Sequence, residues 1–146
     1  YVLKVSGYKW GDLPLDYIVL RYADVLIMYA EAENEVNGPD AGVYDAINQV
    51  RARSGVNMPP IPQGQTQAQM RDIIRHEDRI EFALEGTYYS DIRRWGIAKQ
   101  LMDGTVIKTI GGQQVDVWHF VDALYLWPIP QSEIDLNSKL TQNPGY

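Results

Sequence analysis

Cysteine is absent from this chain of 146 residues, so it can form neither a disulfide framework nor a thiolate zinc site. Histidine is scarce too, and the two that occur, His76 and His119, are too isolated to predict a metal site. No hydrophobic run could cross a bilayer, since the longest, at 25–30, is short and has charges on both sides. We therefore expect a protein with no membrane span, metal or other cofactor.

Basic residues are also in short supply. Thirteen Lys and Arg against 19 Asp and Glu give a net charge of −6. Without a basic stripe to displace counterions from phosphate, the chain is not expected to bind nucleic acid or an anionic membrane surface. Its length and its 45% hydrophobic content suit one domain with a real core. Because it starts at Tyr1 without methionine, we expect a mature product or a fragment of something longer.

Two helices are predicted at 21–36 and 41–53, where apolar residues recur at spacings of three and four. Gly38 and Pro39 should end the first helix, and Asp40 should cap the amino end of the second. The turn between them is so short that they must lie antiparallel. The buried stripe of the first helix is predicted at Tyr22, Val25, Leu26, Tyr29, Ala30 and Val36.

A second antiparallel pair is predicted after the proline-containing loop at 54–65. Its first helix, 66–85, should start with a capping box of Thr66 and Gln69. Its second helix, 88–102, should end at Gly104. Two consecutive pairs suggest a tetratricopeptide-like stack, in which each pair buries its apolar face on its neighbour.

The remaining segments are short or irregular. Alternating residues around Gly111 and Gly112 predict a short β-hairpin, and the proline-rich tail should carry one turn of helix near 131–135. The tail is apolar at 124–129, so we expect it to pack back along the helices. The predicted fold is mainly α and has three parts. Residues 1–20 form an extended leading segment, residues 21–104 form the helical pairs, and residues 105–146 form the hairpin with its packed tail.

Two acidic residues, Glu77 and Glu81, lie one helical turn apart inside the stripe predicted for 66–85, which includes Met70, Ile73, Ile74, Ile80 and Leu84. A carboxylate carried toward a core must meet a cation, because stranding it dry costs several kcal/mol. Arg51 and Arg53 flank the stripe of 41–53, and Arg51 is the expected partner of one carboxylate. Further along, Asp91 and Arg94 have the spacing of a pair on one helix face.

The functional alternative makes Glu77 and Glu81 the acid and nucleophile of a retaining glycosidase, whose carboxyl groups stand about 5 Å apart. Such enzymes need one of the two carboxyls to stay protonated, whereas nearby arginines would keep both ionised. We favour a structural ion network. The sequence shows no nucleophile–base pair, phosphate-binding loop or metal-ligand cluster, and we predict no catalytic residues.

The aromatic residues are biased toward rings with a polar group. Ten Tyr and four Trp stand against two Phe, a composition typical of sugar-stacking or interface surfaces. Four residues in loop or hairpin segments are candidate ligand contacts, with ordinary packing left open as the alternative: Tyr8, Trp10, Trp118 and His119. Three others are predicted to lie in the core: Trp95, Tyr125 and Trp127.

Four sequence blocks, in this order, resemble the SusD/RagB family of outer-membrane nutrient-binding lipoproteins. They are RYADVLIMYAEAENE at 21–35, AINQVRARSG at 46–55, IIRHEDRIEFALEGTYYSDIRRWG at 73–96 and YLWPIPQSEIDLNSKLTQNPGY at 125–146. In that family these blocks build the carboxy-terminal part of a mostly helical protein with tetratricopeptide-like repeats. The chain departs from the common pattern at Asp78 and Tyr88, where the family often has arginine.

The resemblance implies a non-catalytic, surface-exposed protein that captures glycan, or sometimes peptide, and passes it to a TonB-dependent SusC-like transporter. It also implies an upstream portion that carries a lipidated cysteine, and it makes Tyr146 the natural carboxy terminus. Family members that bind starch have their aromatic ligand platform mainly upstream of these blocks. The shared motifs therefore assign no binding residue here. The alternative reading is a helical-repeat scaffold whose main ligand is a protein or peptide.

Overall fold

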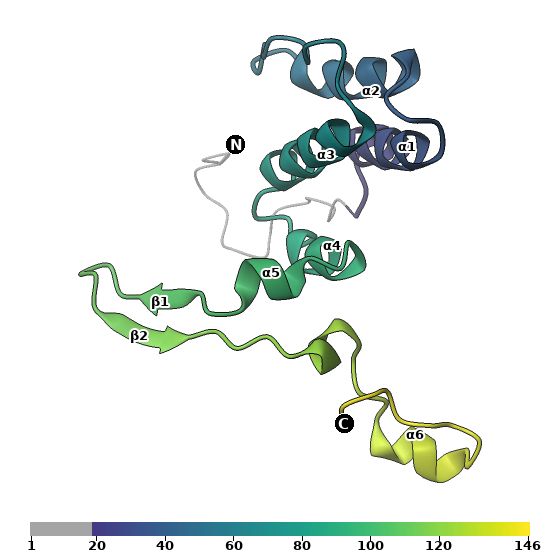
Figure 1. The fold of residues 1–146 in the computed structure, drawn as a ribbon, viewed down its shortest axis with the longest axis vertical. Coiled ribbons are helices and arrows are strands. Elements are labelled where there is room, and N and C mark those ends of the chain that lie inside the picture. The colour runs from purple at the N-terminus through teal and green to yellow at the C-terminus, as the bar shows by residue number, and fades with distance from the viewer. Residues whose placement is uncertain (1–18) are drawn as a thin grey trace, which may run out of the picture. The chain divides into compact units, whose positions relative to one another are not determined.

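The computed structural model describes residues 19–146, and helices make up most of its regular structure (Figure 1). This confirms the prediction of a mainly α fold with one small hairpin. Its contacts divide the chain into two compact units, one ending at Glu81 and the other beginning at Phe82. Each unit has its own set of buried hydrophobic residues.

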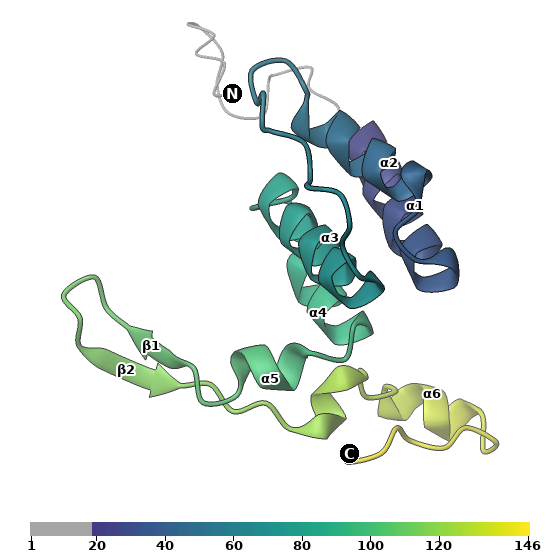
Figure 2. The same cartoon turned by 45° about the horizontal axis from the view of Figure 1, so that its top comes forward.

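The first unit contains α1 (Tyr22–Asn37), α2 (Ala41–Arg51) and α3 (Gln67–Glu81). α1 and α2 lie side by side and are joined by a three-residue turn, so they run antiparallel (Figure 2). Asp40 caps α2 as predicted, because its Oδ1 accepts a hydrogen bond of 3.0 Å from the backbone N of Val43. The predicted capping box before α3 is also present, with Thr66 and Gln69 each bonding the other's backbone N.

Side chains from all three helices form the core of the first unit. Its apolar members are Ile27, Ala30, Val43, Ala46, Ile47, Val50, Met70 and Ile74. One polar side chain, Asn34, is fully buried among them. Asn34 Nδ2 donates to the Gln67 carbonyl at 3.1 Å, and Gln67 Nε2 donates to the Asn34 carbonyl at 2.6 Å. This reciprocal pair satisfies backbone groups at the end of α1 and the start of α3.

The buried face of α1 differs from the predicted stripe. Ile27 and Asn34 are buried with Ala30, and only Ala30 belongs to the predicted set. Four other members of that set are exposed: Tyr22, Val25, Tyr29 and Val36. The helix carries apolar residues on two sides, and periodicity alone does not say which side faces α2 and α3.

α3 ends four residues before the predicted boundary. Leu84 has φ +70° and Gly86 has φ +89°, and left-handed backbone cannot continue a right-handed helix. Leu84 is therefore fully exposed, and Ile80 is 57% exposed, so neither belongs to the buried stripe as predicted. The buried face of α3 is shorter and includes Met70, Ile74 and the carboxylate of Asp78.

The second unit is built from short elements: α4 (Tyr88–Arg94), α5 (Ala98–Met102), β1 (Val106–Lys108), β2 (Gln114–Val117), a 3₁₀ turn (Asp122–Tyr125) and α6 (Gln131–Leu136). The single helix predicted at 88–102 is therefore wrong. Gly96, with φ +70°, ends the first helical segment, a conformation that costs glycine little. Ile92, Ala98 and Phe120 form the buried centre, and Trp95 and Tyr125 pack against it.

The hairpin forms where the sequence predicts it. β1 and β2 are antiparallel, Val106 lies opposite Val117, and a bulge follows Ile107. Two hydrogen bonds extend the pairing beyond the strands, from Gly104 N to the Trp118 carbonyl at 2.8 Å and from Trp118 N to the Thr105 carbonyl at 2.9 Å. Both the backbone N–H and the carbonyl of Trp118 are therefore hydrogen-bonded.

Side-chain amides hold the tail. Gln142 bonds both backbone groups of Ile129, and Asn143 Nδ2 donates to the Trp127 carbonyl at 2.6 Å. Tyr125 packs in the core as predicted, but Trp127 is 70% exposed, so its predicted core position is wrong. Hydrogen bonds to backbone, rather than burial of Trp127, fix this part of the tail.

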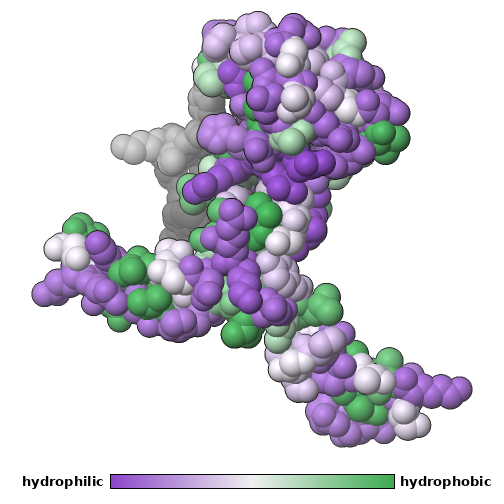
Figure 3. Space-filling model, viewed as in Figure 1, coloured by the Kyte–Doolittle hydropathy of each residue, from purple (hydrophilic) through white to green (hydrophobic). Residues whose placement is uncertain are grey.

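The outer surface is largely polar. On the face seen in Figure 3, hydrophilic side chains cover most of the first unit, and hydrophobic ones stand between them in small groups. Within residues 19–146, no helix combines the length and the hydrophobicity needed to span a membrane.

Candidate functional site

Glu81, the last residue of α3, lies at the centre of an ion cluster. Arg21, which immediately precedes α1, donates from Nη1 to Glu81 Oε1 at 2.7 Å and from Nη2 to the Glu81 carbonyl at 3.0 Å. Arg53, just beyond α2, bonds both carboxylate oxygens of Glu81, with Nη2 to Oε2 at 3.1 Å. One carboxylate thus joins segments next to all three helices, and Arg21 also satisfies a carbonyl at the carboxyl end of α3.

Glu77 lies one turn earlier on α3 and pairs with Arg51, the last residue of α2. Both side chains are nearly buried, at 11% exposure for Arg51 and 12% for Glu77. The same guanidinium donates from Nε to the Pro59 carbonyl at 2.8 Å. Arg51 therefore ties α3 and the proline-containing loop to α2, as expected of a structural ion pair.

Three influences set the protonation state of Glu81. Burial of the carboxyl, the largest single influence, would raise its pKa, but the hydrogen bonds and charges of Arg53 and Arg21 together outweigh it. The net result is a pKa below the ordinary value of 4.5. A catalytic acid needs the opposite shift, toward neutral pH.

A pH dependence of stability follows from this shift. A carboxyl whose pKa is lower in the folded state stabilises the protein above its unfolded pKa and loses that effect as the pH falls through the folded value. We expect the free energy of unfolding to fall below about pH 4.5, with a smaller fall in Glu81→Gln than in the unaltered protein. Chemical denaturation of both at pH 7 and pH 3.5 measures the difference. Equal pH dependence would mean that Glu81 does not contribute.

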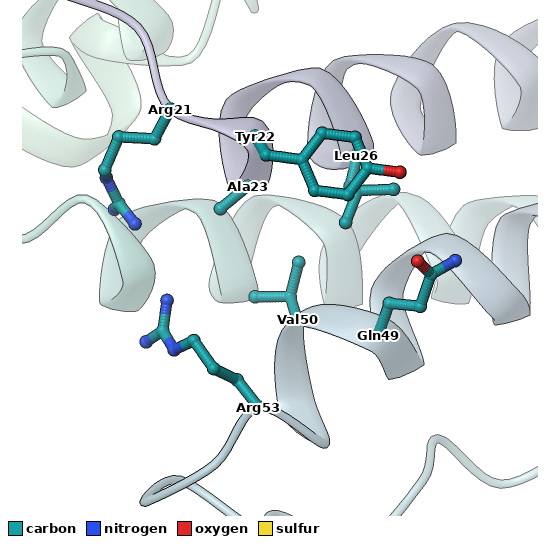
Figure 4. A pocket seen from close by; sticks show the side chains of 7 residues that line it. All are labelled: Arg21, Tyr22, Ala23, Leu26, Gln49, Val50 and Arg53. Carbon is teal, nitrogen blue, oxygen red and sulfur yellow. The ribbon is translucent and has the colours of Figure 1, made fainter.

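A pocket of about 430 Å³ lies beside this cluster, between α1 and α2. Its lining residues are Arg21, Tyr22, Ala23, Leu26, Gln49, Val50 and Arg53. Figure 4 shows the guanidinium groups of Arg21 and Arg53 converging at one end, with Tyr22 and Gln49 at the other. Two guanidinium groups, one phenol and one side-chain amide supply the polar groups of this lining, so the pocket offers hydrogen-bond donors beside an apolar floor of Ala23, Leu26 and Val50.

The candidate ligand contacts do not lie in this pocket. Tyr8 and Trp10 fall outside the described residues. Trp118 and His119 directly follow β2 in the second unit, and both side chains are exposed. Both side chains are therefore accessible to a ligand. The backbone of Trp118 is held in place by its hydrogen bonds to Gly104 and Thr105.

The second unit also contains ion and cation–π contacts. Asp91 Oδ1 accepts from Arg94 Nε at 2.9 Å, at the spacing of three used in the prediction. Arg93 was missed: its guanidinium lies 5.3 Å from the ring centroid of Tyr89 and 4.9 Å from that of Trp127. Its Nη2 also donates to the Tyr125 carbonyl at 2.7 Å. Arg93 thus holds the tail to α4, and no local sequence signal distinguishes it from Arg94.

Two acidic residues of the first unit were also missed. Asp78 is buried on α3, whereas the helical wheel placed its neighbour Glu77 in the buried stripe. Glu35, on α1, forms a two-point pair with Arg71 of α3, with contacts of 2.5 Å and 2.6 Å. Over residues 19–146, no group of three or more His, Asp or Glu side chains could hold a metal ion.

The sequence model of the SusD family matches residues 14–146, nearly the whole chain. The chain belongs to the SusD family. Among curated relatives, the SusD-like protein P2 of Formosa agariphila is 34% identical over 148 residues, which cover 97% of this chain and 28% of the relative. The SusD-like protein P25 of the same organism is 42% identical, with 88% of this chain and 24% of the relative covered.

Solved structures agree with this assignment. A SusD-like protein from Bacteroides fragilis is 34% identical, with a TM-score of 0.73 over 89% of this chain and 26% of its own. A SusD-like carbohydrate-binding protein from the same species is 38% identical, with a TM-score of 0.67 over 84% of this chain and 28% of its own. The chain therefore corresponds to about a quarter of the length of these SusD proteins.

Proposed function

We propose that the protein binds glycan at the cell surface and passes it, chemically unchanged, to a TonB-dependent SusC-like transporter in the outer membrane. The observation that carries the proposal is membership of the SusD family, together with 38% identity to a SusD-like protein described as carbohydrate-binding. The whole protein would be held at the outer membrane by a lipidated cysteine upstream of these residues.

The absence of catalysis is part of the proposal and rests on the acids of α3. The two carboxylates that could act as a glycosidase pair, Glu77 and Glu81, are each bonded to guanidinium groups. The lowered pKa of Glu81 keeps it ionised. An ionised Glu81 has no proton to give to a leaving sugar oxygen, and the Glu77 carboxylate is held in a nearly buried pair with Arg51.

Binding without turnover is directly testable. The full-length protein is expected to be retarded in native gels that contain a soluble polysaccharide and to release heat on titration with its oligosaccharides. The same mixtures should contain no new reducing ends after prolonged incubation. Release of product that disappears in Glu77→Ala and Glu81→Ala would contradict the proposal.

Trp118 and His119 are proposed as ligand contacts, because an exposed indole on a fixed backbone suits stacking against a sugar ring. We expect Trp118→Ala to weaken glycan binding about tenfold, equivalent to about 1.4 kcal/mol. Calorimetry on the full-length protein measures the change. Trp127→Ala is the matched control, since Trp127 is also exposed but lies against Arg93. Equal affinities for Trp118→Ala and the unaltered protein would remove Trp118 from the site.

The alternative function is a helical-repeat scaffold whose main ligand is a protein or peptide. The exposed apolar side of α1 favours it, since such surfaces often mark contacts between proteins. Capture of a large transporter together with no affinity for any polysaccharide tested would support this reading over glycan binding.

A further inference from the structure

The pocket between α1 and α2 has two ends of different chemistry. The guanidinium groups of Arg21 and Arg53 form one end, and Tyr22 and Gln49 form the other (Figure 4). Its volume of about 430 Å³ falls within the range of about 300–1,000 Å³ that is typical of small-molecule sites. The pocket lies in the first unit, apart from the ligand contacts proposed in the second.

Arg53 keeps hydrogen-bonding capacity for a ligand in this pocket. A guanidinium group has five N–H donors, and Glu81 accepts one from Nη1 and one from Nη2 of Arg53. The three other donors are left for a ligand. The Arg53 side chain is 48% exposed, so a molecule arriving from solvent can reach it.

The guanidinium end of the pocket favours an anionic group, and a carboxylate in particular. Arg21 and Arg53 share the single carboxylate of Glu81, and Glu81 itself is not among the lining residues. An anion in the pocket therefore meets the two guanidinium groups before it meets Glu81. The planar fork of a guanidinium matches the two oxygens of a carboxylate.

The rest of the lining favours a ring that carries hydroxyl groups. Tyr22 and Leu26 lie one turn apart on α1, and Leu26 and Val50 belong to the apolar floor. The Tyr22 side chain is largely exposed, so its ring is open to stacking. The amide of Gln49 can both donate to and accept from a hydroxyl. A small inorganic anion would use only the two arginines.

We propose that this pocket binds a uronic acid residue of a glycan, with its carboxylate on Arg53 and Arg21 and its ring over the apolar floor. The inference rests on the proposed function, since it takes the ligand to be a glycan, and it adds that this glycan is acidic. The pocket is then a second contact point for the chain of sugars, in addition to Trp118.

Calorimetry on the full-length protein tests the proposal, with digalacturonate and its dimethyl ester as probes. The ester keeps the shape of the disaccharide and removes its charge, so we expect the acid to bind at least about tenfold more tightly. Gln49→Glu places a negative charge in the lining and should weaken binding of the acid at least about tenfold. Gln63→Glu is the matched control, since Gln63 is also exposed but lies outside the lining, and it should leave that affinity unchanged.

Three results would overturn the assignment. Equal affinities for the acid and the ester would mean that the carboxylate is not recognised. Equal affinities of Gln49→Glu and Gln63→Glu for the acid would place its binding outside this pocket. Binding of a glutamyl-glutamate dipeptide as tight as that of digalacturonate would mean that the pocket recognises carboxylates and not a sugar.

A neutral polysaccharide separates failure of this assignment from failure of the proposed function. Retardation of the full-length protein by a neutral polysaccharide, with no affinity for digalacturonate, would overturn the uronic acid site alone. Affinity for no glycan of either kind would contradict the proposed function as well.

Discussion

Replacing Glu77 with alanine is expected to lower the free energy of unfolding by about 3 kcal/mol, because it leaves a nearly buried guanidinium without its carboxylate. Arg51 cannot turn toward solvent freely, since its Nε is also bonded to the Pro59 carbonyl at 2.8 Å. Glu77→Gln keeps the shape of the side chain and an acceptor oxygen for Arg51, so it should cost less. Chemical denaturation of the full-length protein at pH 7 measures both variants.

Glu35→Ala is the control for this experiment. Glu35 also forms an acid–guanidinium pair between α1 and α3, but its side chain is 44% exposed, against 12% for Glu77. Solvent screens such pairs, so its loss should be much smaller than that of Glu77. If Glu77→Ala and Glu35→Ala had equal effects, the Glu77 carboxylate would be a solvated group rather than part of the core.

Replacing Ile74 with alanine should lower the free energy of unfolding by about 3 kcal/mol, as expected when a buried isoleucine leaves a cavity. Ile74 is fully buried between the helices of the first unit. Ile80→Ala makes the same chemical change on the same helix, but Ile80 is largely exposed, so its effect should stay within about 0.5 kcal/mol. Denaturation curves of the two variants give the comparison.

This pair of variants also tests which residues of α3 face the core. The helical wheel predicts both isoleucines in one buried stripe, whereas only Ile74 is buried. Equal losses in the two variants would mean that Ile80 is covered in the full-length protein. The buried face of α3 would then extend along the whole predicted stripe.

The helical part of the first unit could be predicted from sequence because its signals are local. Asp40 as a cap, Thr66 with Gln69 as a capping box, and apolar residues at helical spacing all act within one or two turns. The hairpin could be predicted for the same reason, since two glycines separate two alternating segments.

The misses occur where a local sequence pattern is compatible with more than one outcome. Gly96 breaks the predicted fourth helix, although isolated glycines within helices are often tolerated. One side of α1 looks buried in sequence because it is apolar, yet Tyr22, Val25, Tyr29 and Val36 are exposed in the structure. Trp127 is held through its carbonyl and by Arg93, which composition cannot reveal.

The positions of residues around each helix predicted some of the acid–guanidinium contacts but not all of them. They place Glu77 and Glu81 on a side of α3 that meets the end of α2, where Arg51 and Arg53 lie. They could not predict Arg21, which reaches Glu81 from a position 60 residues earlier in the chain. The ligand contacts are a different case, since Trp118 and His119 are proposals that rest on exposure and residue type.

The most direct test of a structural role for these acids is a double-mutant cycle on Arg51 and Glu77 in the full-length protein. Arg51→Ala, Glu77→Ala and the double variant are unfolded chemically, and their losses are compared. We predict that the double variant loses at least about 1.5 kcal/mol less than the sum of the single losses, because each single change strands the other charge. Losses that add to within about 0.3 kcal/mol would contradict a buried ion pair that holds α2 to α3.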